Sequence, residues 1–387
     1  MISPALNLQL LEQQYGGVLK GDLSAVAVRQ IITDSRKVKP GDCFIALVGE
    51  HMNGHDYIDQ ALVKGAKQVV TDRPLDISAD VLQWIVTDTT RALGHMAQAH
   101  RAKYKGKVFA LTGSAGKTTV KSLLHSVLSE VASTAATKGN FNNHIGVPYT
   151  LLDLQQEDMA VIEMGASGPN EIAYLCELAK PDVTLITNIL PAHLEGFGSI
   201  DGVAKAKQEI YKALPESGVA IINLDEPYSR QWLAELNEIS TLCFSRDKNN
   251  SQADVYLKSF SVDECGSLTV EVCDKSSNDE LQVKTQLVGE HNLSNVLAVV
   301  ASAKAMGLSL AQMQKGLELF QPVAGRMQVH NLPQGFVVDD SYNANPAAVK
   351  AGIDFICQQT VKPILALGAM GELGESSEEM HLSLIHI

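Results

Sequence analysis

One segment constrains the fold of this chain more than any other, because an apolar run passes into a glycine-spaced loop and then into a helical pattern. The run covers residues 108–111 and the loop residues 113–119, after which apolar residues recur over 120–127 at the three-to-four-residue spacing of a helix. Glycines in such a loop permit backbone conformations in which successive N–H groups point at one anion. The order of strand, loop and helix predicts a nucleotide phosphate site in an α/β fold.

The residues of the loop suit individual parts of a nucleotide. Lys117 is placed to reach the distal phosphates, and the hydroxyl of Thr118 is placed to meet Mg²⁺. Leu111 is a departure, since the long form of the phosphate-loop motif has a glycine there. A chance glycine–lysine turn is the alternative, but the flanking pattern favours a nucleotide site. The predicted phosphate-binding residues are Gly113, Ser114, Ala115, Gly116, Lys117, Thr118 and Thr119.

Length, charge and cysteine content limit the class of protein. A chain of 387 residues exceeds the roughly 100 to 200 residues of one domain, so more than one domain is expected. The net charge of −13 argues against a general nucleic-acid or anionic-membrane surface and favours a small partner. The six cysteines form no C-x-x-C pair, and no apolar segment is long enough to span a membrane. We expect a cytoplasmic protein with reduced thiols.

Strand and helix patterns predict three consecutive units. Residues 1–85 form a small α/β unit with strands near 31–36, 43–47 and 68–71 and a helix near 57–64. Residues 86–319 form a central unit whose strands near 107–111, 159–163, 183–187 and 219–223 alternate with helices, as in a mostly parallel sheet. Residues 251–288 alternate polar and apolar side chains, which predicts an antiparallel β insertion. Residues 320–387 begin a further unit with strands at 336–340 and 363–368 and a helix from Pro346.

Several polar residues follow predicted strands of the central unit. Glu163 ends one strand and is either a metal ligand or a cap of the next helix, and His193 follows another strand, where a structural role is the alternative. Lys205 and Lys207 fall in a helical pattern that also fits solvated lysines.

Amide-rich and charged loops supply the remaining candidates. The loop that contains Asn140, Asn142 and Asn143 either binds a ligand or follows ordinary turn chemistry. Asn292 and Asn295 either recognise a base or cap the helix that follows them. Arg326 and Asp340 lie in loops of the last unit, from which an arginine could reach a transferring phosphate, although exposed charges are common.

Taken together, these segments resemble the Mur ligases, the ATP-dependent amide-forming enzymes of peptidoglycan synthesis. Within that family the resemblance is greatest to the branch that adds D-alanyl-D-alanine to UDP-N-acetylmuramoyl-tripeptide. The resemblance rests on motifs spread over nearly the whole chain, at 112–119, 139–148, 163–166, 188–198, 206–207, 291–295, 325–326, 339–346 and 367–374.

The resemblance implies a fold and a set of roles. The fold would be a three-domain α/β Mur ligase, with a small N-terminal UDP-sugar domain, a central ATP domain on a mostly parallel sheet, and a Rossmann-like ligase domain. Lys117, Lys207, His193 and Arg326 would be catalytic, and ATP would be bound by the phosphate loop with Asn292, Asn295, Arg326 and Asp340. Mg²⁺ would be held by Thr118, Glu163, His193 and Lys207, the last of these carbamylated, and the substrates by Asp34, Ser35, Arg36, Asn140, Asn142 and Asn143.

The implied reaction is ATP-dependent ligation through an acyl phosphate, and we expect the acting species to be a monomer. Another ligase of the superfamily, such as the tripeptide-forming Mur enzyme or folylpolyglutamate synthase, is one alternative, and a non-catalytic nucleotide-binding protein is the other. The family's last domain continues well past residues 370–381, and residues 382–387 do not resemble it. We therefore expect an incomplete C-terminal domain. If the domain is incomplete, nucleotide binding would survive while ligase turnover would be lost.

Overall fold

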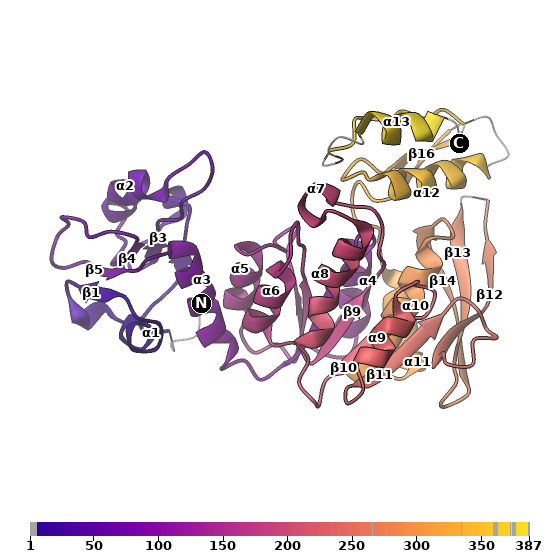
Figure 1. Cartoon of the computed structure of the whole chain (residues 1–387), viewed down its shortest axis with the longest axis horizontal. Helices are drawn as coiled ribbons and strands as arrows, with labels where there is room; N and C mark the ends of the chain where they lie inside the picture. Colours follow the sequence, from indigo (N-terminus) through magenta and orange to yellow (C-terminus); the bar gives the residue numbers. More distant parts are fainter. Residues whose placement is uncertain are drawn as a thin grey trace. The chain divides into compact units, whose positions relative to one another are not determined.

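The computed structural model describes residues 6–264, 266–333, 335–358, 363–371, 373 and 377–385. The chain divides into two compact units, and Figure 1 labels their elements. Unit 1 consists of Met1–Gly106, Lys138–Glu157 and Glu177–Ala179, and unit 2 consists of Lys107–Thr137, Asp158–Cys176 and Lys180–Ile387.

Unit 1 is a small α/β unit built on a sheet with the strand order β1-β5-β4-β3-β2. Strands β2 to β5 are parallel, and β1 pairs antiparallel with β5. The predicted strands and helix of this region are confirmed. The described elements are β1 (Val18–Lys20), β2 (Ile31–Ile32), β3 (Cys43–Ile45), β4 (Gln68–Thr71), β5 (Leu82–Ile85), α1 (Leu8–Tyr15), α2 (Ile58–Val63), α3 (Thr89–Arg101), α5 (Gly146–Asp153) and the short 3-10 turns η1 (Leu23–Ala25), η2 (Ser35–Lys37) and η3 (Gly54–Tyr57).

Unit 2 contains a sheet with the order β14-β13-β12-β11-β10-β9-β6-β8-β7. The strands from β7 to β12 are parallel to their neighbours, as the alternation of strands and helices predicts. Its strands are β6 (Lys107–Thr112), β7 (Thr134–Ala136), β8 (Met159–Glu163), β9 (Val183–Ile186), β10 (Val219–Asn223), β11 (Ser240–Ser245), β12 (Val255–Val262), β13 (Ser267–Asp274) and β14 (Asp279–Val288). Strands β12, β13 and β14 pair antiparallel, which confirms the predicted β insertion.

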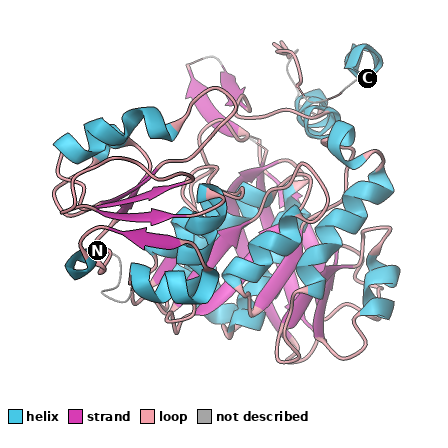
Figure 2. Cartoon of the chain, turned by 60° about the vertical axis from the view of Figure 1, so that its left-hand side comes forward, coloured by secondary structure: helices cyan, strands magenta, loops and turns pink. Residues whose placement is uncertain are grey.

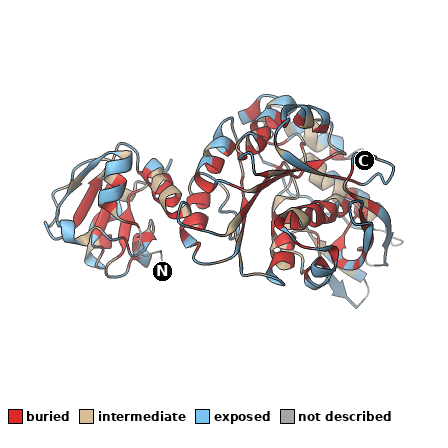
Figure 3. Cartoon of the chain, turned by 90° about the horizontal axis from the view of Figure 1, so that it is seen from below, coloured by how far each residue is buried: buried red, intermediate tan, exposed pale blue. Residues whose placement is uncertain are grey.

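Helices pack against this sheet, as Figure 2 shows in cyan and magenta. They are α4 (Lys117–Ser129), α6 (Glu171–Ala179), α7 (Leu194–Phe197), α8 (Ile200–Lys212), α9 (Ser229–Glu235), α10 (Asn292–Met306) and α11 (Leu310–Leu319). Buried residues, red in Figure 3, follow the strands and the inward sides of the helices. Helix α10 is apolar on nearly all sides and is buried along most of its length, so it forms the centre of the core together with α4.

The position of β6 in the sheet places the phosphate loop among other functional segments. Strand β6 pairs with β8 on one side and β9 on the other, with Leu111 opposite Glu163 and Thr112 opposite Ile186. Parallel strands end at the same edge of a sheet, where ligands of open α/β folds bind. The segments that follow β6, β8 and β9 therefore meet at this edge.

The last part of unit 2 holds a hairpin of β15 (Gln328–Leu332) and β16 (Gly335–Asp339), followed by α12 (Pro346–Cys357) and α13 (Ser377–Ile385). The predicted strand near 336–340 and the helix from Pro346 are confirmed. The predicted strand at 363–368 is wrong, since these residues form no regular structure and Ile364 is 97% exposed. An apolar run becomes a strand only where a neighbouring strand pairs with its backbone, and the described residues supply none here.

Among the described residues, no helix is both long and apolar enough to cross a membrane.

Candidate active site

The phosphate loop connects β6 to α4, and its glycines are required by geometry. Gly113 has φ +151°, and a Cβ there would lie 1.8 Å from Thr187 Oγ1. Gly116 has φ +78°, and a Cβ there would lie 2.7 Å from Asn295 Oδ1. Leu111 lies in the buried strand before the loop, so a side chain is accommodated there.

The segment after β9 fixes the path of the loop. The Ala115 N–H donates to Asn188 Oδ1 over 2.8 Å, and the Ala115 carbonyl accepts from Thr187 Oγ1 over 2.6 Å. Ser114 Oγ donates to the Leu190 carbonyl and accepts from the Leu190 N–H, each over 2.9 Å. Ser114 and Ala115 thus position the loop. Gly116, the N-cap of α4, provides no side-chain hydrogen bond, so no N-cap side chain occupies the first N–H groups of the helix.

Lys117 folds back over the loop that precedes it. Its ammonium donates to the Gly113 carbonyl over 2.6 Å and lies 3.4 Å from the Ser114 carbonyl. Burial lowers the pKa of Lys117, while the nearby charge of Glu163 opposes this shift. The cation is therefore held against loop carbonyls, where phosphate oxygens would be stronger acceptors. Thr119 follows in the first turn of α4.

Thr118, Glu163 and Lys121 form a buried polar cluster beside the loop. Thr118 Oγ1 lies 3.1 and 3.3 Å from the two carboxylate oxygens of Glu163, to which it donates. The ammonium of Lys121 lies 3.2 Å from Glu163 Oε2. The Glu163 N–H donates to Thr137 Oγ1 over 2.9 Å, and the N-cap residue of the next helix, α6, is Asn170 and not Glu163. Lys121 has no motif of its own, and its one sequence signal is the helical spacing of four residues from Lys117.

Lys207 and Lys205 are clearly distinguished by burial. Lys207 lies on α8 and is 2% exposed, with its ammonium 5.8 Å from the centre of the Phe197 ring, whereas Lys205 is exposed. Burial, and after it the charge of Lys117, lowers the pKa of Lys207 well below its usual value. Burial therefore favours the uncharged form of the Lys207 amine more than it would for an exposed lysine. His193 is the residue before α7, with φ +50°, a left-handed conformation that is uncommon outside glycine.

The two asparagines at the start of α10 hydrogen-bond to each other rather than capping the helix. Asn295 Nδ2 donates to Asn292 Oδ1 over 2.7 Å, and Asn292 Nδ2 donates to the Val288 carbonyl over 2.8 Å. Both side chains are buried, and Asn295 is the residue that excludes a side chain at Gly116. The structure thus brings Asn295 to the phosphate loop.

Arg326 joins the same cluster from the last part of the chain. Its Nη2 donates to Thr118 Oγ1 over 2.9 Å, and its guanidinium lies 4.3 Å from the centre of the Tyr342 ring. Asp340 Oδ1 accepts the Met327 N–H over 3.1 Å, and burial raises the pKa of Asp340 against that hydrogen bond. Tyr342 lies within the motif at 339–346, two residues after Asp340, but is not among the predicted site residues.

The predicted substrate residues of unit 1 form two separate local motifs. Asp34 caps the turn η2 and forms a bidentate pair with Arg36, over 2.9 and 3.0 Å, which lowers the pKa of Asp34 to about 2. Ser35 is buried and its hydroxyl donates to Gln60 Oε1 over 2.5 Å. Asn143 Oδ1 accepts the N–H groups of Ile145 and Gly146, over 3.1 and 2.8 Å, at the start of α5.

Asn140 and Asn142 share a tight turn, in which the Asn142 N–H donates to the Asn140 carbonyl over 2.7 Å. Asn140 is exposed and Asn142 is half-buried. This hydrogen bond is ordinary turn chemistry, which is one of the two explanations of the loop, and substrate binding by these amides stays a prediction.

Comparison with known proteins explains why these separated motifs occur together. Family descriptions match three consecutive segments: the Mur ligase family catalytic domain at 27–105, the Mur ligase middle domain at 111–303 and the Mur ligase glutamate ligase domain at 325–386. The UDP-N-acetylmuramoyl-tripeptide–D-alanyl-D-alanine ligase of Escherichia coli is 39% identical over 375 residues, which cover 96% of this chain and 81% of that protein. The chain belongs to the Mur ligase family.

Solved Mur ligase structures agree with this assignment. The crystal structure of MurF from Acinetobacter baumannii superimposes with a TM-score of 0.91 at 35% identity, covering 98% of this chain and 82% of that one. The MurF ligase of Thermotoga maritima in complex with ADP gives a TM-score of 0.81 at 31% identity, covering 92% of this chain and 81% of that one. The middle-domain match contains the whole phosphate loop, Glu163, Lys207 and Asn295.

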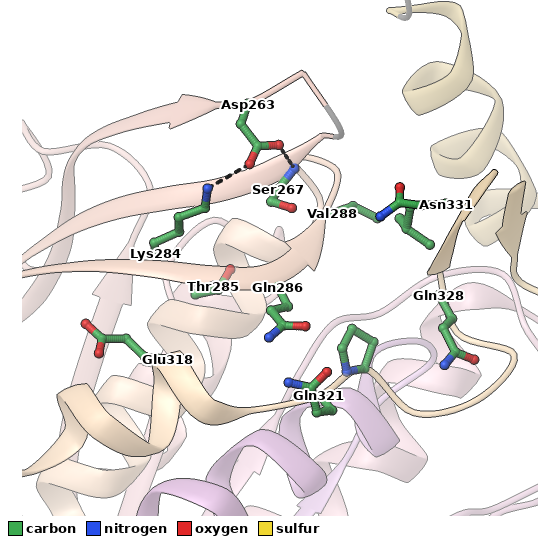
Figure 4. A pocket seen from close by; sticks show the side chains of 12 residues that line it. Asp263, Ser267, Lys284, Thr285, Gln286, Val288, Glu318, Gln321, Gln328 and Asn331 are labelled. Carbon is green, nitrogen blue, oxygen red and sulfur yellow. Dashed lines mark hydrogen bonds and ion pairs between the residues drawn. The ribbon is translucent and has the colours of Figure 1, made fainter. Parts of the chain in front are cut away.

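A pocket of about 590 Å³ in this Mur ligase is separate from the predicted site residues. Figure 4 shows its side chains, among them Gln286, Gln321, Gln328 and Asn331, with the ion pair of Asp263 and Lys284 at its edge. None of the predicted phosphate-loop or metal residues lines it. The candidate site is therefore defined by its hydrogen-bond network and not by this cavity.

Proposed function

We propose that this Mur ligase uses ATP to join D-alanyl-D-alanine to UDP-N-acetylmuramoyl-tripeptide through an acyl phosphate. The observation that carries the proposal is the 39% identity to the E. coli UDP-N-acetylmuramoyl-tripeptide–D-alanyl-D-alanine ligase across 96% of the chain. The loop geometry supports it, because two glycines are held where side chains would collide with Thr187 and Asn295. The superimposed MurF structure that holds ADP supports ATP as the nucleotide.

The reaction takes place in two steps. A carboxylate is a poor electrophile, so its oxygen first attacks the γ-phosphorus of ATP, and the bond to the β-phosphate oxygen breaks to release ADP. The dipeptide amine then attacks the carbonyl carbon of the acyl phosphate, the carbon–oxygen bond to phosphate breaks, and the amine loses a proton. Amide and inorganic phosphate result, and Lys117 with the first N–H groups of α4 would offset the phosphate charge.

The donor set around Thr118 fits a magnesium ion. Hydroxyl and carboxylate oxygens, the ligand types that Mg²⁺ prefers, come within 3.3 Å of each other at Thr118 and Glu163. Within the described part of the chain no three His, Cys, Asp or Glu side chains cluster, which suits an ion held largely by phosphates and water. Thr118, Glu163, His193 and Lys207 would hold it, and it would neutralise phosphate charge.

The remaining predicted roles belong to the same proposal. Burial favours the uncharged form of the Lys207 amine, which is the form that adds carbon dioxide, and the carbamate would supply an anionic oxygen. Asn292 and Asn295 would meet the adenine region, Arg326 and Asp340 the phosphates from the C-terminal side, and Arg36 the UDP moiety. The described cysteines are free, which is compatible with a reducing cytoplasm, and we expect a monomer.

The test is phosphate release from ATP, measured with both substrates and with each one left out. We expect release only when UDP-N-acetylmuramoyl-tripeptide and D-alanyl-D-alanine are both present. Turnover with another amine acceptor in preference to the dipeptide would place the chain in another ligase branch. ATP binding without any turnover would indicate a nucleotide-binding protein instead.

A further inference from the structure

Lys121 is a buried cation with one acidic partner beside the candidate nucleotide site. It lies one helical turn after Lys117 on α4, and its side chain is 5% exposed. Its ammonium meets Glu163 Oε2 over 3.2 Å, and Thr118 donates to the same carboxylate. The two residues linked to Lys121 in this way, Thr118 and Glu163, already have proposed roles, while Lys121 has none.

Packing alone does not explain a lysine at this position. The neighbouring residues of α4, Val120, Leu123 and Leu124, are fully buried and belong to the hydrophobic core. Burying two charges carries a desolvation cost, and apolar residues of similar volume often replace such a pair without loss of stability. A lysine that contacts a carboxylate oxygen, as Lys121 contacts Glu163 Oε2, restricts how that carboxylate can turn.

We propose that Lys121 is a positioning residue, which holds Glu163 Oε2 so that the carboxylate is oriented toward the metal ion that accompanies the nucleotide. This inference rests on the proposed function. Partners that fix a metal-binding carboxylate typically contribute about tenfold to hundredfold in metal affinity. Because the Lys121 ammonium contacts Glu163 Oε2, the proposed effect on the metal ion is exerted through Glu163.

The experiment measures binding of Mn²⁺, as a probe for Mg²⁺, to the complex of the full chain with ADP. We expect K121M to bind Mn²⁺ about tenfold to hundredfold more weakly, while its affinity for ADP in EDTA is unchanged. K121R, which restores a cation, should recover part of the loss. K304M is the matched control, because Lys304 pairs with Asp274 in the same unit, and it should bind Mn²⁺ like the unsubstituted chain.

A double-substitution cycle tests whether Lys121 acts through Glu163. In an E163Q background the K121M change should have no further effect on Mn²⁺ affinity, and this comparison also serves if K121M alone does not fold. Equal or tighter Mn²⁺ binding by K121M, or a further loss in the E163Q background, would overturn the proposal. If the unsubstituted chain binds ADP without any metal dependence, the proposed function itself fails, and the role of Lys121 fails with it.

Discussion

Glu163 and Glu226 are acidic residues at the same edge of the central sheet, but their surroundings differ. Glu163 ends β8 and has the Lys121 ammonium and the Thr118 hydroxyl as partners. Glu226 follows β10, and its Oε2 accepts the Ile189 N–H over 3.0 Å. Burial raises the pKa of Glu226 to about 7 despite that hydrogen bond.

Two buried lysines, one near Glu163 on α4 and one on α8, also differ in whether they have a partner of opposite charge. Lys121 on α4 has a carboxylate partner, whereas buried Lys207 on α8 has no acidic partner within ion-pair distance among the described residues. The α4–β8 region therefore holds matched charges before any ligand binds. The α8–β10 region holds two groups, Lys207 and Glu226, whose pKa values are shifted by burial so that their neutral forms are favoured.

Substitution of Lys117 is expected to have the largest effect, because its charge influences both regions. We expect K117A to lower the rate of phosphate release by about a hundredfold to a thousandfold, since a cation facing the phosphates is lost. The measurement is steady-state turnover with both substrates. K212A, at a lysine of α8 paired with Glu235 near the surface, is the control. A K117A rate within about tenfold of the unsubstituted chain would remove Lys117 from the site.

Lys207 and Lys205 provide the sharpest test of the α8–β10 region, since they lie two residues apart on one helix. We expect K207A to lower turnover by about a hundredfold and K205A to leave it unchanged, because only Lys207 is buried near Lys117. NMR with ¹³C-labelled bicarbonate should show a carbamate signal that K207A lacks and K205A keeps. A signal that survives in K207A would assign the modification elsewhere.

The parts of this site that are local in sequence could be predicted from the sequence. The strand, loop and helix of residues 107–129 follow from apolar spacing and two glycines. The burial of Lys207 also has a sequence signal, because it lies four residues after Val203 and three before Ile210 on one helical face, and both are buried. The collision partner of Gly113 could not be predicted, since Thr187 belongs to a distant segment.

The errors come from reading apolar or polar content without its partners. Residues 363–368 are apolar enough for a strand, but a strand depends on pairing that no local pattern specifies. Asn292 and Asn143 look alike in sequence, yet Asn143 supports the start of a helix while Asn292 bonds within a buried cluster. Roles that depend on bound ligands stay predictions.

The partly buried carboxyl group of Glu226 should make the free energy of unfolding depend on pH. Its folded pKa of about 7 exceeds the usual 4.5, so the folded chain binds more protons between these values, and stability falls as pH rises through about 7. We expect E226Q to gain about 2 kcal/mol relative to the unsubstituted chain between pH 5 and pH 8, measured by urea unfolding. E238Q, at an exposed glutamate, is the control. If the free energy of unfolding of E226Q changed with pH in parallel with that of the unsubstituted chain, the pKa of Glu226 would not be raised in the folded chain.

The smallest expected effect extends the comparison to unit 1, where the side-chain oxygen of Asn143 already accepts hydrogen bonds from the backbone. Because its Oδ1 accepts two N–H groups at the start of α5, N143A should lower the free energy of unfolding by about 1 kcal/mol. N140A, at an exposed asparagine of the same loop, should change stability less. The KM for UDP-N-acetylmuramoyl-tripeptide distinguishes the two roles. An N143A variant of unchanged stability but raised KM would mean that this amide contacts substrate, and that a capping residue at this loop can also be a ligand.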